Sequence, residues 1–139
     1  MVRADVARAK IARAQSWLEE AQALFERPRE VYLADAKGRD LAAFYLFLAV
    51  QECIDLAAHW VADEGWEPPD AAGAAFDLLA DRGAITQRAA DAMRAATGLR
   101  NRIAHGYARV EHRRIYDEAP EGLAAMREFL SAAANAAGL

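Results

Sequence analysis

Apolar residues recur at helical spacing along nearly the whole of this 139-residue chain. A first helix is expected over residues 3–26, where the apolar stripe strengthens from Val6 to Phe25 and Pro28 then stops it. The longest and most apolar helix is expected over residues 40–64. Asp40 is a suitable N-cap for it, and the Gly65 to Pro69 turn ends it.

The remaining apolar segments are shorter but keep helical spacing. Residues 29–39 form an ambiguous connector that could hold a helical turn, because Lys37-Gly38 makes a break there. A short helix is expected over residues 71–81, and the next one begins after the N-cap Thr86. A polar bend over residues 110–117 precedes a last helix with Pro120 in its first turn. The chain is therefore predicted to be all-α: one domain over residues 1–139, folded as an up-and-down four-helix bundle with an extra short helix.

Composition adds the expected environment of the protein. Glycine and proline are sparse, with 8 and 4 residues, and alanine is abundant, which favours helix throughout. The single Cys53 rules out an internal disulfide framework and is typical of a reducing compartment. The N-terminal residues form no apolar signal segment, and the charge-free run 41–51 is too short to span a bilayer. A cytoplasmic protein with no membrane association is expected.

Charge is distributed unevenly. The net charge of −4 argues against indiscriminate coating of nucleic acid. Between positions 94 and 114, however, six arginines face one acid, Glu111; they are Arg94, Arg100, Arg102, Arg109, Arg113 and Arg114. Such a cluster attracts phosphates, although a solvated arginine-rich helix face would give the same count.

The run from Leu99 to Tyr107 is the first candidate for chemistry. Arg100 offers a planar fork of donors for a phosphate, and His105 can move a proton near neutral pH, which together suit phosphodiester chemistry. Five positions on a helix do not stack on one face, so the two side chains converge only if the helix ends between them. Gly106 favours such an end. By itself the pattern is weak, because a histidine near a helix end is commonly structural.

Polar residues on the longest predicted helix are the second candidate. Glu52 and Asp55 lie on the same face of this helix as Leu41, and that face changes from apolar to polar along the helix. They therefore border either a polar cleft or a solvated rim. His59, further along the same face, is expected to be a surface or a hydrogen-bonded histidine and not a catalyst. The histidines and the cysteine are dispersed, and no Gly-rich phosphate loop is present, so neither a metal nor a cofactor is expected.

Several blocks, taken in order, resemble the HEPN superfamily and specifically the HepT-like ribonuclease toxins. The motif of that family is Arg, four residues with a polar one first, His, one residue and Tyr, and here it runs from Arg100 through Asn101 to His105 and Tyr107. Further blocks of likeness fall at 51–59, 65–69, 75–79 and 98–101. The resemblance covers most of residues 40–116. It implies a HEPN four-helix bundle that homodimerises and cleaves RNA without a metal.

The resemblance also assigns roles to residues. His105 would be the general acid or base, Arg100 would hold the scissile phosphate, and Asn101 would orient the substrate. The 2′-hydroxyl of RNA is an internal nucleophile, so positioning, proton transfer and charge stabilisation suffice for cleavage. Candidates for nonspecific phosphate contacts are Arg102 and Arg109. From their helix spacing, Glu52 and Asp55 are expected to orient the catalytic pair or to contact a partner.

Tyr107 has a separate expected role. The resemblance implies a toxin of a type VII toxin–antitoxin system, whose partner is a nucleotidyltransferase antitoxin similar to the MntA proteins. That antitoxin would transfer AMP to Tyr107 and so block the RNA pocket by charge and bulk. Tyr107 could instead stack on an RNA base. The alternative for the whole chain is a non-catalytic HEPN binding module that partners a nucleotidyltransferase.

Overall fold

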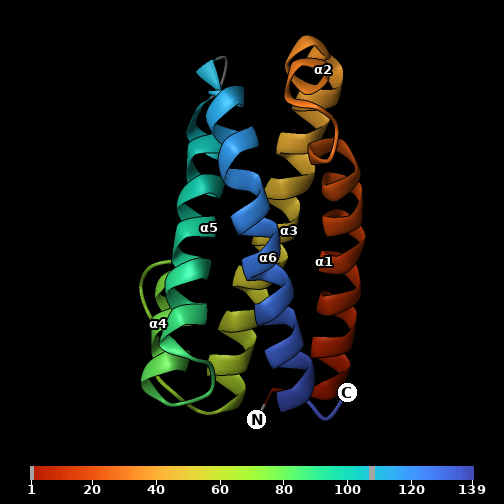
Figure 1. Ribbon diagram of the computed structural model, residues 1–139. Coiled ribbons are helices and arrows are strands. Elements are labelled where there is room, and N and C mark those ends of the chain that lie inside the picture. The colour runs from red at the N-terminus through yellow and green to blue at the C-terminus, as the bar shows by residue number, and fades with distance from the viewer. Residues whose placement is uncertain (1, 107–108) are drawn as a thin grey trace.

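The computed structural model describes residues 2–106 and 109–139. This part of the chain is all-α and contains no strand, as predicted. Its helices are α1 (Ala4–Phe25), α2 (Arg29–Ala34), α3 (Ala36–Asp63), α4 (Ala74–Asp81), α5 (Gln87–Gly106) and α6 (His112–Ala136). The long helices α1, α3, α5 and α6 run up and down as a bundle (Figure 1). Two short helices are present where one was expected, since α2 forms in the ambiguous connector.

The two ends of the bundle differ in what they carry. Both chain ends and α4 lie at one end of the bundle, whereas α2, the last turn of α5 and the first turn of α6 lie at the other (Figure 1). Packing at this second end is fixed by side chains. The Tyr116 hydroxyl donates to the Arg27 carbonyl at 2.7 Å, and Arg29 makes two 3.1 Å hydrogen bonds to Asp117. The end that holds the predicted motif is therefore tied together across α2 and α6.

One apolar core runs through the bundle, and α3 contributes more of it than any other helix. Within the described residues, α3 is also the one helix long and apolar enough to cross a membrane by length and composition. Half of its most apolar window is buried against the other helices. The core helix of a bundle passes the same composition test, so this is weak evidence for a membrane span.

The start of α3 differs from the prediction. Its N-cap is Asp35, whose carboxylate accepts a hydrogen bond from the Gly38 amide at 3.0 Å, so Asp40 lies inside the helix. Gly38 lies in the first turn of α3 and does not break the helix. A Cβ there would clash with the Asp35 carboxylate and lie 2.7 Å from Arg27 Nη2. Close approach at the cap, and not a turn, explains the glycine.

The start of α6 also differs. The helix begins at His112, so residues 112–117 are its first turns and Pro120 lies in its interior. Proline cannot donate to the carbonyl four residues back, a defect of about 3 kcal/mol in a helix interior. Ile115, Ala119 and Leu123 are all buried and recur every four residues across the proline, so core packing extends the helix through it.

The buried face of α1 differs in part from the stripe that the sequence predicts, which includes Val6, Lys10 and Trp17 as well as Leu18, Ala21 and Phe25. The buried residues are Ala7, Ile11, Ala14, Leu18, Ala21 and Phe25, whereas Val6, Lys10 and Trp17 lie at its border. Three of these buried residues are alanines, and α1 packs mainly on α3. Hydrophobicity alone does not show this preference for small residues.

Candidate functional site

The helix α5 continues through Gly106, so it does not end between Arg100 and His105 as expected. Five positions on an α-helix correspond to a rotation of about 140°. Arg100 accordingly contacts α3, while His105 lines a cavity beside α6. Within one chain the structure does not bring the two motif side chains together.

Arg100 is held on three sides. Its Nη2 donates to Gln51 Oε1 at 2.6 Å, and its Nη1 donates to Asn101 Oδ1 at 2.6 Å. The guanidinium carbon lies 5.2 Å from the centre of the Phe47 ring. All three partners are uncharged, so the position of the guanidinium is fixed while its positive charge is not neutralised. An arginine of this kind is suited to bind an anion.

Gln51 is the site residue that the sequence reasoning missed. Its Nε2 donates to Asp55 Oδ1 at 3.0 Å, which orients the amide so that its oxygen faces Arg100. Asp55 in turn lies 3.9 Å from the Lys10 ammonium on α1. The local signal for the bond between Gln51 and Asp55 was their spacing of four residues, one helical turn, on α3.

The predicted pair Glu52 and Asp55 has divided roles. Asp55 is linked to Arg100 through the hydrogen bonds of Gln51. Glu52 lies 3.3 Å from Arg13 and 3.6 Å from Lys10, so it ties α3 to α1 instead of contacting the motif. The two carboxylates lie at the rim of the α1–α3 contact, and only one is connected to Arg100.

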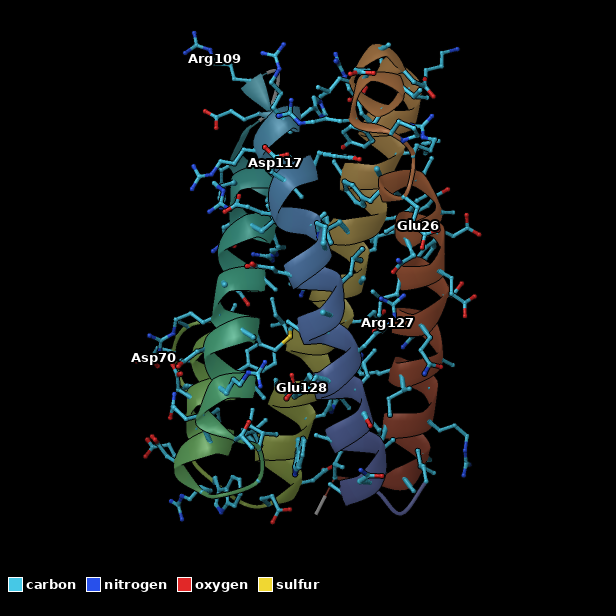
Figure 2. All side chains as sticks on the ribbon, in the orientation of Figure 1. Glu26, Asp70, Arg109, Asp117, Arg127 and Glu128 are labelled. Atoms are coloured by element: carbon cyan, nitrogen blue, oxygen red, sulfur yellow. The ribbon has the colours of Figure 1, made fainter. Side chains whose placement is uncertain are left out.

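His105 has a different environment. It is exposed in the last turn of α5 and lines a cavity of about 280 Å³ together with Arg102, Arg109 and Arg114. Arg102 Nη2 donates to Glu118 Oε2 at 2.6 Å, and Arg114 Nε donates to the same oxygen at 3.2 Å. Arg109 is exposed at the end of the bundle, where α6 begins (Figure 2). The histidine thus faces a basic cavity, although Glu118 neutralises part of its charge.

The other predicted site residues lie away from Arg100 or outside the described part of the chain. Tyr107 lies outside the described residues. His59 is exposed on α3, as expected. Among residues 2–106 and 109–139, no three His, Cys, Asp or Glu side chains gather in a way that could hold a metal ion. His112 lies with its Nε2 3.3 Å from Asp40 Oδ1, and burial together with Arg39 lowers its pKa.

The all-α bundle of the described residues has the helical fold of the HEPN class of proteins. The family model "HepT-like: Ribonuclease HepT-like" matches residues 14–133, and the chain belongs to this family. No curated protein matches the sequence.

Solved structures share the fold. A chain of a toxin–antitoxin crystallised with AMP-PNP superposes with a TM-score of 0.83 at 22% identity, over 93% of this chain and 98% of that one. The tri-AMPylated HEPN toxin of Shewanella oneidensis, in complex with MNT antitoxin, gives 0.83 at 23% identity, over 92% and 96%. The cytosolic protein YutE of Bacillus subtilis, of unknown function, gives 0.78 at 17% identity, over 98% and 92%.

Proposed function

We propose that this protein is a metal-independent endoribonuclease and the toxin of a cytoplasmic toxin–antitoxin pair. The observation that carries the proposal is Arg100, fixed by Gln51, Asn101 and Phe47 with its charge unneutralised, on the same helix as the exposed His105. A fixed cation and a free imidazole are what cleavage by the RNA 2′-hydroxyl requires. Membership of the HepT-like family supports the same activity.

The proposed reaction assigns each group a step. The 2′-oxygen attacks phosphorus and loses its proton to a base, the bond from phosphorus to the 5′-oxygen breaks, and an acid protonates that oxygen. The products are a 2′,3′-cyclic phosphate and a 5′-hydroxyl. His105 serves as acid or base, and Arg100 stabilises charge on the equatorial oxygens. Asn101 uses its oxygen on Arg100, which leaves its amide NH₂ to donate to the substrate.

Arg100 and His105 diverge within one chain, and we therefore propose a homodimer in which His105 of one copy works with Arg100 of the other. Leu41 and Phe44 support this arrangement, because they are 46% and 53% exposed on α3. Phe44, Phe47 and Gln51 follow one another at helical spacing, so the apolar patch leads directly to Arg100. Phe44→Asp should give monomers by sedimentation, whereas Leu139→Asp, at another exposed leucine, should not. A variant F44D that stays dimeric would exclude this face.

The test of the activity is cleavage of RNA in EDTA by wild type and by His105→Ala. Loss of a general acid or base costs about 10²- to 10⁴-fold, so H105A should lose most or all cleavage and still fold by circular dichroism. His59→Ala, at an exposed histidine on α3, is the matched control and should retain activity. Cleavage by H105A at the wild-type rate would contradict the proposal. A well-folded wild type without cleavage would favour the non-catalytic binding module.

Control by an antitoxin is the second part of the proposal. An MntA-like nucleotidyltransferase would attach AMP to Tyr107, which follows Gly106 in the sequence; Gly106, His105 and Arg109 line the same cavity. The added phosphate would occupy the arginines and the nucleoside would fill the space. Intact mass after co-expression should increase by AMP units at Tyr107, with loss of cleavage, and Tyr107→Phe should remain unmodified. An unmodified Tyr107 in an inhibited complex would contradict this step.

A further inference from the structure

A second basic cavity lies on the other side of the first turn of α6. Its volume is about 540 Å³, and Leu33, Arg39, His112 and Arg113 are among its lining residues. They come from the end of α2, the start of α3 and the start of α6. The site proposed above does not use this cavity.

The basic residues that line the cavity have few polar partners. Arg39 gives one hydrogen bond to the Leu33 carbonyl at 2.8 Å, and its buried Nε has none. The Nδ1 atom of His112 is also buried without a partner. Arg113 is exposed and forms no ion pair with any residue of the described part of the chain. The one carboxylate lining the cavity is Glu111. The lining thus offers arginine charge to an anion.

The second cavity shares lining residues with the cavity that His105 faces. Glu111 and Arg114 line both, so the two cavities adjoin around the start of α6. In Figure 1 the same end of the bundle brings the start of α6 beside the end of α5 and near α2. An extended, negatively charged chain leaving His105 would meet the second cavity next.

We infer that this second cavity is a phosphate subsite for the RNA strand, which takes a phosphodiester flanking the cleaved one. The inference rests on the proposed ribonuclease function and adds where the substrate strand runs. Arg39 and Arg113 are the binding residues, and Arg114 lies between the two cavities. A substrate with only the scissile phosphate gains nothing from the subsite, whereas a longer strand binds through it.

The experiment compares a dinucleotide, which has only the scissile phosphate, with an oligonucleotide containing the same step and flanking phosphates. Arg113→Gln should raise KM for the oligonucleotide about tenfold, with kcat unchanged, and leave dinucleotide cleavage unchanged. The salt dependence of oligonucleotide binding should fall by about 0.7 in log–log slope, the value for one lost contact to a single strand. The matched control is Arg88→Gln, which removes one exposed arginine from the first turn of α5 and should change neither substrate.

Two results would overturn the subsite. An R113Q variant that matches R88Q on both substrates would show that no flanking phosphate binds here. Equal losses on the dinucleotide and the oligonucleotide would place Arg113 at the scissile phosphate instead. If wild type cleaves neither substrate, the ribonuclease proposal fails, and anisotropy with a 2′-deoxy oligonucleotide decides the subsite separately. Binding weakened by R113Q and by Arg39→Gln, but not by R88Q, would support it, and unchanged binding would overturn it.

Discussion

The two sides of the last turns of α5 differ in how their charged groups are held. On the side facing α3, Arg100 has two 2.6 Å hydrogen bonds and an aromatic ring against it. On the other side, His105 is exposed to a basic cavity. If the protein is the proposed ribonuclease, one chain fixes the group that would stabilise negative charge. The group that would transfer a proton would then depend on substrate or a second copy for its partners.

Two arginines, two positions apart on α5, show the same contrast. Arg100 is bonded to amide oxygens, whereas Arg102 is bonded to the Glu118 carboxylate. An amide partner fixes direction and leaves the charge available, while a carboxylate partner cancels it. Arg102 was expected to bind phosphate, and its ion pair makes it the weaker candidate.

Among changes to the two arginines and their partners, the largest effect should come from changing the geometry of Arg100 while keeping its charge. Arg100→Lys removes the planar fork that can bind Gln51, Asn101 and a phosphate at once, so kcat should fall about 100-fold. Arg102→Lys, two positions further along α5, should cost less than about tenfold. Single-turnover cleavage of one RNA by both variants measures this difference. Equal losses would remove the distinction between the two arginines.

A smaller effect should follow from removing a hydrogen bond to Arg100 without changing Arg100 itself. Gln51→Leu removes a hydrogen bond to a charged group, worth about 1.5–3 kcal/mol, and should lower kcat/KM by roughly 10- to 100-fold. Gln87→Leu is the matched control, because Gln87 makes the same one-turn bond to Asp91 at 2.9 Å on the first turn of α5. Thermal melting of both variants separates positioning from folding. If Q51L and Q87L cleave alike, Gln51 does not position Arg100.

The sequence predicted the helices best where a local signal marks an end. Thr86 accepts the predicted cap bond from the Ala89 amide at 3.0 Å, and α1 ends before Pro28 as expected. The predicted start of α3 was wrong because Asp35 caps the helix three residues before Gly38, and the predicted start of α6 was wrong because core packing extends the helix through Pro120. The motif residues were likewise visible in sequence. The contact between Gln51 and Arg100 joins residues that are 49 positions apart, so no local pattern contains it.

The smallest expected effect concerns the second histidine at this end of the bundle. The His112 side chain is 14% exposed, and burial, followed by the nearby Arg39 charge, lowers its pKa. Between that lowered pKa and the ordinary value near 6.5, the unfolded chain binds more protons than the folded one. Stability should therefore decline as pH falls through this range.

His112→Gln should weaken that pH dependence, since glutamine cannot take up the proton. Urea unfolding at pH 7.5 and 5.5 measures it, and His59→Gln, at the exposed histidine on α3, is the control. Wild type should lose more stability than H112Q on acidification. An equal loss in H112Q would show that His112 is not the responsible group.

The most direct test of the divergent arrangement mixes two inactive variants, Arg100→Ala and His105→Ala. If Arg100 of one copy works with His105 of the other, each mixed dimer regains one intact site of its two. Random pairing makes half of the dimers mixed, so about a quarter of wild-type cleavage should return. Wild-type protein taken through the same exchange must remain active. A mixture no more active than either variant alone would contradict the shared site and place both groups in one chain.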